Sequence, residues 1–170
     1  TDEVLMDKYF NGEEFTSKEI LSAVKNGIDN CSMVPVLFGS ALKNIGVKAL
    51  MDMIAEFFPS PAEIKQRTAN KPGTDEIIEI NTDENGPVSL CVFKTLIDPY
   101  VGKLSYFKVM SGTLKGDMTL KNIRKDDTER VSRLFAMCGK KQIEVKSLSA
   151  GDIGAVNKLA FTKTGDTLCD

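Results

Sequence analysis

The sequence predicts a mixed α and β protein, in which the C-terminal fragment of an α/β domain precedes an antiparallel β-barrel. In residues 1–64, apolar residues recur at helical spacing on both sides of one continuous apolar run. In residues 87–170, short alternating runs are separated by turn sequences. The stretch from Pro59 to Pro87 holds four of the six prolines, and within it only Ile77–Ile80 has the pattern of a short strand. We therefore expect two domains joined by a linker over residues 65–86.

Two helices are expected at the start of the chain. A short helix over roughly residues 2–10 should end near Gly12, because glycine readily adopts the left-handed conformation that closes a helix. Thr16, followed three residues later by Glu19, fits a capping box, in which each residue satisfies a backbone N–H group of the other. A second helix should therefore begin immediately after Thr16.

The continuous apolar run VPVLF, residues 34–38, predicts a strand that is buried on both faces of a parallel sheet. The stretch GSALKNIGV, residues 39–47, follows it as a turn, and apolar residues then recur at helical spacing until Pro59. A parallel sheet cannot be one strand wide. We therefore expect residues 1–64 to be the tail of a larger domain whose other strands lie outside this chain.

The second half of the chain has the pattern of a barrel or sandwich. Strand-like runs such as GKLSYFKV, ERVSRLFAM and DIGAVNKL follow one another at short intervals. Turn sequences that include DPYVG, SGTLKGD, CGKK and SAGD separate them. Short strands with tight turns between them favour an antiparallel barrel.

Charge is distributed unevenly along the chain. Residues 1–64 carry 5 lysines and 10 acidic residues, whereas residues 87–170 carry 14 lysines and arginines and 9 acidic residues. The net charges of −5 and +5 permit a nucleic-acid partner for the second half without requiring one. No apolar run approaches the roughly 20 residues that span a bilayer. We expect a cytoplasmic protein with no membrane partner.

Several kinds of catalytic site are excluded by composition. The chain has no histidine, which removes Ser-His and Cys-His catalysis. Its four cysteines lie far apart without a Cys-x-x-Cys pair, so reduced thiols are expected and no metal site is assigned. No Gly-x-x-x-x-Gly-Lys-Ser/Thr loop is present to hold phosphates. We assign no catalytic residue.

The turn after the apolar run leaves two interpretations open. Ser40 is not followed by the glycine of a nucleophile elbow, so it is not a candidate nucleophile. Ala41 has little bulk, and a flat ring could lie against the turn while the N–H groups of Ser40 to Leu42 face its edge. The alternative is that the small residues only allow a tight turn between strand and helix.

Two long stretches of the chain resemble a known family. "VPVLFGSALKNIGVKALMDMIAEFFPSP" is similar to the end of the GTPase domain of bacterial elongation factor G, the ribosomal translocase. "VFKTLIDPYVGKLSYFKVMSGTLKGD" and "AGDIGAVNKLAFTKTGDTLCD" resemble its second domain, a β-barrel. The segment "MCGKKQIEV" departs from the commoner translocase pattern and is more similar to elongation-factor-G-like paralogues.

The resemblance implies a nucleotide role for the turn. Ser40, Ala41 and Leu42 would contact the guanine base, and GTP or GDP with magnesium would be bound by a longer parent protein that hydrolyses GTP. The phosphate loop, the switch regions and the Asn-Lys-x-Asp motif of the family lie upstream of this chain. We therefore expect no hydrolysis, and no bound cofactor, in residues 1–170 alone.

The resemblance also implies that the barrel docks on small-subunit ribosomal RNA. Among its cations, the candidates for RNA contact are Lys121, Arg124, Lys140 and Lys141. One alternative is a non-catalytic barrel that only binds RNA or the ribosome. Another is a paralogue that protects the ribosome from antibiotics. Without its sheet, the apolar helix face of residues 1–64 is also a candidate for self-association.

Overall fold

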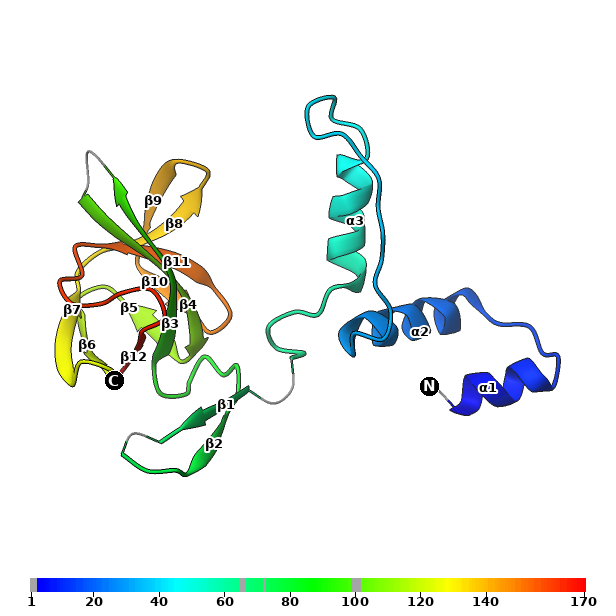
Figure 1. Ribbon diagram of the computed structural model, residues 1–170, viewed down its shortest axis with the longest axis horizontal. Helices are drawn as coiled ribbons and strands as arrows, with labels where there is room; N and C mark the ends of the chain where they lie inside the picture. The colour runs from blue at the N-terminus through cyan, green and yellow to red at the C-terminus, as the bar shows by residue number, and fades with distance from the viewer. Residues whose placement is uncertain (1–2, 65–66, 72, 99–101) are drawn as a thin grey trace. The chain divides into compact units, whose positions relative to one another are not determined.

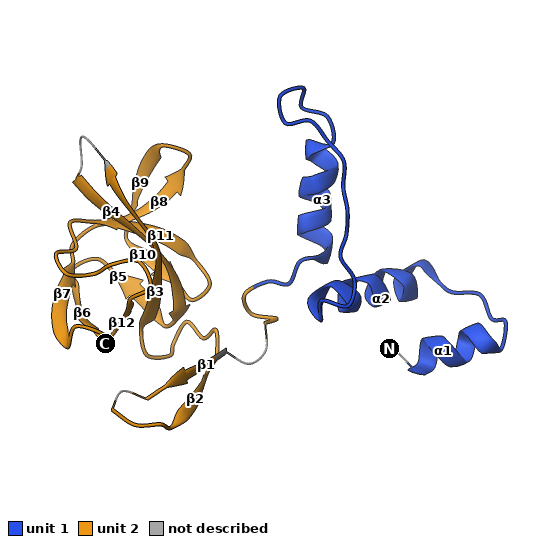
Figure 2. Ribbon diagram, in the orientation of Figure 1, with its two compact units in different colours: residues 1–60 blue, residues 61–170 orange. Residues whose placement is uncertain are grey.

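The computed structural model describes residues 3–64, 67–71, 73–98 and 102–170, so the expected DPYVG turn lies partly outside the described residues. The chain divides into two compact units, residues 1–60 and residues 61–170 (Figure 2).

The first unit contains the helices α1 (Glu3–Phe10), α2 (Ser17–Asp29) and α3 (Val47–Phe57) (Figure 1). The capping box before α2 is confirmed, because Thr16 Oγ1 accepts from the N–H of Glu19 at 3.3 Å and Glu19 Oε2 accepts from the N–H of Thr16 at 2.8 Å. Lys8 Nζ lies 2.7 Å from Glu19 Oε1 and links α1 to the start of α2. The local Thr16–Glu19 pattern therefore sets the start of α2.

The expectation of a buried strand at residues 34–38 is wrong in this structure. These residues form no strand, and the side chains of Val34 and Phe38 are 78% and 89% exposed. Among described residues 3–60, the only β pairing is an isolated bridge between Ser40 and Ile45. A buried strand needs neighbouring strands to bond its backbone and cover its side chains, and the described part of this unit supplies none.

The second unit begins with a two-stranded hairpin of β1 (Arg67–Asn70) and β2 (Ile77–Ile80). The strand expected at Ile77–Ile80 is present, and its partner β1 was not foreseen. An eight-stranded antiparallel sheet follows in the order β7-β6-β12-β3-β4-β11-β8-β9, with a separate β10–β5 ribbon. The bounds are β3 (Ser89–Asp98), β4 (Gly102–Ser111), β5 (Thr113–Lys115), β6 (Met118–Asn122), β7 (Asp127–Val131), β8 (Leu134–Cys138), β9 (Lys141–Val145), β10 (Ser147–Ser149), β11 (Ile153–Asn157) and β12 (Thr167–Cys169).

The strands of the second unit curl around a main apolar core (Figure 1). Its members alternate along the strands, as Leu90 and Val92 do on β3 and Phe107 and Val109 do on β4. This period of two is the one that the sequence predicted. The predicted fold class, mixed α and β with an antiparallel barrel, is confirmed. In the part of the chain that the structure describes, no helix is long and apolar enough to cross a membrane.

Candidate functional site

The turn before α3 is closed by its own backbone. The N–H of Ser40 donates to the carbonyl of Ile45 at 2.9 Å, and the N–H of Ile45 donates back to Ser40 at 3.0 Å. Inside this bridge, the N–H of Asn44 donates to the carbonyl of Ala41 at 3.3 Å. The N–H of Lys43 donates to Ser40 Oγ at 3.4 Å. Residues 40–45 therefore form a small closed loop.

Two glycines allow the two ends of this loop to approach each other. A Cβ atom on Gly39 would lie 2.7 Å from the carbonyl oxygen of Ile45, and one on Gly46 would lie 2.7 Å from the carbonyl oxygen of Phe38. Gly46 also has a φ of +76°, which disfavours residues with a side chain. Any larger residue at either position would force the loop open.

The structure changes the interpretation of Ser40, Ala41 and Leu42. The amide of Ser40 is used inside the loop, so it is not available to a ligand as the sequence suggested. Among the described residues, the amides of Ala41 and Leu42 have no acceptor, and Leu42 is 97% exposed. Two adjacent free donors can bind the edge of a planar ligand that carries acceptor atoms.

Two of the four cations suggested for RNA contact, Lys121 and Arg124 of the β6–β7 hairpin, are held by acidic residues. Lys121 Nζ lies 2.6 Å from Asp126 Oδ1, and this hydrogen bond raises the pKa of Lys121 and lowers the pKa of Asp126. Arg124 Nε lies 2.6 Å from Oδ1 of the buried Asp166. Their charges are thus partly neutralised within the protein.

Lys140 and Lys141 lie at the exposed turn between β8 and β9, next to Gly139 with a φ of +59°. Among the described residues, neither lysine has an ion-pair partner. β7 and β9 stand at opposite ends of the strand order, and Figure 1 shows the β6–β7 and β8–β9 turns well apart. The structure therefore does not bring the four cations into one cluster.

A buried polar network inside the second unit was not foreseen from the sequence. Asn122 Nδ2 donates to Thr162 Oγ1 at 3.1 Å and to Asp166 Oδ2 at 2.9 Å. Glu129 Oε1 accepts from the N–H groups of Phe161 and Thr162. These contacts fix the loop before β12. The sequence contained an indication of this network. Glu129 lies two residues before the buried Val131 on β7, so both side chains point to the inner face of the strand.

Asp166 is the central acid of this network, and its carboxyl group is almost fully buried. Burial raises the pKa of Asp166, but hydrogen bonds from Asn122 and the N–H of Lys163, together with Arg124, outweigh it and lower the pKa below its usual value. The carboxylate therefore stays charged inside the unit and joins the end of β6 to the loop before β12.

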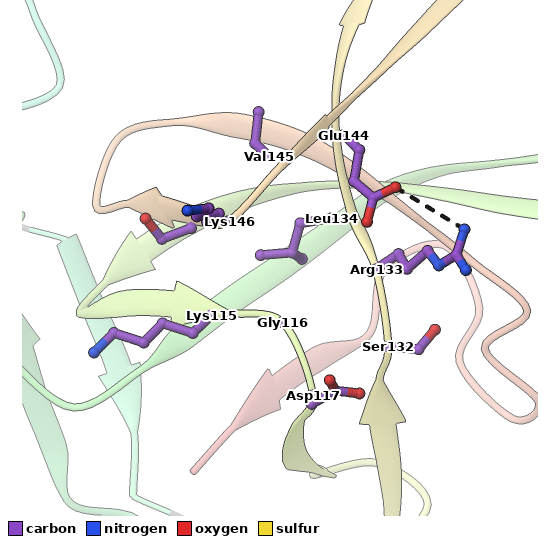
Figure 3. Close-up of a pocket in the computed structure, with 10 residues that line it drawn as sticks. Lys115, Gly116, Asp117, Ser132, Arg133, Leu134, Glu144, Val145 and Lys146 are labelled. Atoms are coloured by element: carbon purple, nitrogen blue, oxygen red, sulfur yellow. Dashed lines mark ion pairs between the residues drawn. The ribbon is translucent and has the colours of Figure 1, made fainter.

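A mixed-charge cleft of about 580 Å³ lies between the end of β5, the β7–β8 connection and the end of β9 (Figure 3). Arg133 Nη1 lies 3.9 Å from Glu144 Oε2 across it. On its other side Asp117 is bound by Arg130 at 2.9 Å. The acidic groups of the cleft thus face cations of the same chain, and the cleft has no arrangement suited to nucleophilic or acid–base catalysis.

Comparison with known proteins places the second unit in a family. The family model described as elongation factor G domain 2 matches residues 87–170. A crystal structure of a protein from Thermus thermophilus matches 99% of this chain with a TM-score of 0.73 and 29% sequence identity. The chain spans 23% of the length of that protein. The barrel of this chain, residues 87–170, is therefore an elongation factor G domain 2.

Proposed function

We propose that residues 1–170 are part of a longer ribosome-associated GTPase that promotes translocation, and that this part supplies the guanine-side turn and a ribosome-contacting barrel. The observation that carries the proposal is the family match over residues 87–170. The closed turn at residues 40–45 supports the nucleotide part, because it presents two adjacent free amides beside a small residue. GTP or GDP and magnesium belong to the longer protein in this proposal.

The exposed apolar run at residues 34–38 is consistent with the same proposal. Its side chains and its backbone are uncovered in this chain. In the longer protein, neighbouring strands would bond this backbone and bury these side chains, and the turn would then lie at the carboxyl end of a strand, where α/β proteins bind ligands. The phosphate loop and the switch regions would come from the rest of that protein.

The nucleotide part is tested in the longer protein by measuring GDP affinity with a fluorescent nucleotide. Ala41→Phe places a ring where the base would lie, and we expect affinity to fall by about tenfold or more, equivalent to about 1.4 kcal/mol. Leu42→Ala is the matched control, because it keeps the backbone amide and removes a side chain that faces solvent. Equal affinities for Ala41→Phe and the control would refute the assignment of this turn.

Residues 1–170 alone are expected to bind no nucleotide tightly, because they lack a phosphate-binding loop. Isothermal calorimetry with GDP provides the measurement. A micromolar affinity would show that the proposed division of the site is wrong.

The ribosome part is tested by cosedimentation with small ribosomal subunits over a range of salt concentrations. Lys140→Glu with Lys141→Glu should weaken binding more than Lys121→Glu with Arg124→Glu, because the second pair is already engaged by acidic groups. Equal losses for the two double variants would place the contact elsewhere on the barrel. Binding without GTP hydrolysis in the longer protein would instead favour a non-catalytic ribosome-binding module.

A further inference from the structure

The outer face of the barrel carries an apolar patch that the core does not require. The patch consists of Phe93, Tyr106, Phe135, Met137, Ile153 and Ala155, on four neighbouring strands. The strand register places Ala155 directly between Tyr106 and Phe135, so these three residues form one row across β4, β11 and β8. Sheet faces turned away from a core normally carry polar residues.

This patch is separate from the core inside the barrel. On β4, Phe107 and Val109 point inward, so Tyr106 and Lys108 lie on the other face. The buried members Phe135 and Ala155 belong to a second apolar cluster, against which Tyr106 and Met137 pack. Phe135 and Ala155 thus form the buried base of the patch, Tyr106 and Met137 are half-buried on it, and Phe93 and Ile153 are its exposed members.

A β-bulge places an aromatic ring and a cation side by side over this patch. The pairing of β3 with β4 shifts between Val92 and Lys94, so Phe93 is the extra residue and Lys94 stands opposite Tyr106. The rings of Phe93 and Tyr106 lie 6.4 Å apart at an interplanar angle of 49°, and Phe93 remains 47% exposed. Bulges commonly redirect side chains at functional sites.

The charges around the patch favour an anionic partner. Lys94 flanks Tyr106, and Lys108 stands opposite Ile153 on the outer face. Neither lysine has an ion-pair partner within the described residues. Two acidic residues of the described part of the chain lie near the patch. Glu144, opposite Phe135, faces Arg133 at 3.9 Å, and Asp152, which precedes Ile153, accepts from the N–H of Ser149 at 2.9 Å. An exposed ring between free lysines suits a base that stacks while its phosphates meet ammonium groups.

We propose that this outer patch is a binding site for unpaired nucleotides of single-stranded RNA, with a base stacked on Phe93 and phosphates bound by Lys94 and Lys108. This proposal rests on the proposed function in one respect only, namely that the partner is RNA. It uses a different surface from Lys140 and Lys141. Because a duplex hides the faces of its bases, the site should prefer single strands.

The absence of tryptophan from the chain provides a direct probe. Phe93→Trp keeps a stacking ring and introduces a single tryptophan, whose emission should be quenched when a short single-stranded RNA is added to residues 1–170. Phe10→Trp, at an exposed phenylalanine of the first unit, is the matched control and should show no quenching. A duplex RNA should quench Phe93→Trp less than the single strand does.

Affinity and its salt dependence then separate stacking from charge. Phe93→Ala should weaken single-strand binding by about tenfold and leave the salt dependence unchanged. Lys94→Gln should lower the slope of log K against log salt by about 0.7, the value for one phosphate contact with a single strand. Lys115→Gln, which removes one charge from a different strand of the same unit, should leave that slope nearly unchanged.

Three outcomes would overturn the proposal. One is an affinity for single-stranded RNA that does not change in Phe93→Ala. If Lys140→Glu with Lys141→Glu still weakens binding to small ribosomal subunits, the proposed function stands while this site fails. Another is equal quenching of Phe93→Trp by duplex and single strand. The third is a blue shift of Phe93→Trp emission with rising protein concentration alone, which would show that a second copy of the chain covers the patch.

Discussion

Replacing Asp166 by alanine tests whether the buried network holds the barrel together. The carboxylate accepts from Asn122 Nδ2 and from the N–H of Lys163, each at 2.9 Å, and it lies 2.6 Å from Arg124 Nε. In Asp166→Ala these donors lose their acceptor at a position with almost no solvent access. The loss should therefore be much larger than for an exposed acid.

The magnitude follows from the burial of each donor. Asn122 is fully buried, so its unpaired N–H costs about 1–3 kcal/mol, and the partly buried N–H of Lys163 adds about 1 kcal/mol. Arg124 is half exposed and can turn to water, so it adds little. We expect a loss of about 2–4 kcal/mol in the free energy of unfolding of the second unit.

The assay is urea unfolding followed by the fluorescence of a tryptophan at position 93, introduced as Phe93→Trp so that the signal reports on the barrel alone. With a urea dependence of about 2 kcal/mol per molar, the midpoint should fall by about 1–2 M. Asp126→Ala is the control, because Asp126 lies in the β6–β7 turn and is exposed. A midpoint for Asp166→Ala that equals the control would refute the reasoning.

The same acid predicts a pH dependence. Its pKa is lower in the folded protein than its ordinary value of 3.8, so the unfolded chain takes up the proton first as the pH falls. The stabilisation from Asp166 is therefore complete above the ordinary value and disappears as the pH falls through the lower folded pKa. The free energy of unfolding of Asp166→Ala should lack this component when measured over the same acid range.

Two further predictions concern the first unit. A hydrogen bond from Lys8, followed by bonds from Thr16, lowers the pKa of Glu19 from 4.5 to about 2, so the stabilisation that it gives α2 is complete above pH 4.5 and is lost as the pH falls towards 2. NMR titration of the Glu19 carboxyl group measures this pKa, and a normal value would contradict the observed contacts. Gly46→Ala should open the turn, because it adds a clash to the strain of a positive φ, whereas Gly12→Ala adds only the strain. Hydrogen exchange at the Ser40 amide should accelerate in Gly46→Ala and remain unchanged in Gly12→Ala, and no acceleration in Gly46→Ala would contradict the role of this glycine.

The sequence predicted the elements whose causes are local. Thr16 and Glu19 are three residues apart, and their mutual hydrogen bonds depend on that spacing alone. The short alternating runs of residues 87–170 likewise predicted strands before any pairing was known. The resemblance supplied the family, which the match over residues 87–170 supports.

The apolar run at residues 34–38 marks the limit of this reasoning. Its composition is that of a buried strand, yet a strand is defined by its neighbours, and the described part of the first unit contains none. Hydrophobicity shows that a segment should be covered, but it does not show what covers it. The guanine-side role of Ser40, Ala41 and Leu42 likewise remains a prediction, because residues 1–170 contain no phosphate-binding loop that would complete a nucleotide site.

The sequence by itself determined the helix caps, the alternating strands, the turn glycines and the charge of each half. Only the tertiary structure decided which cations are engaged by acids, because Arg124 meets Asp166 through a contact between residues far apart in the chain. It also placed Phe93 beside Tyr106, since a bulge shifts the register of two strands in a way that alternation alone does not reveal. Contacts between distant residues depend on strand order and register, and these are set by the packing of the whole unit.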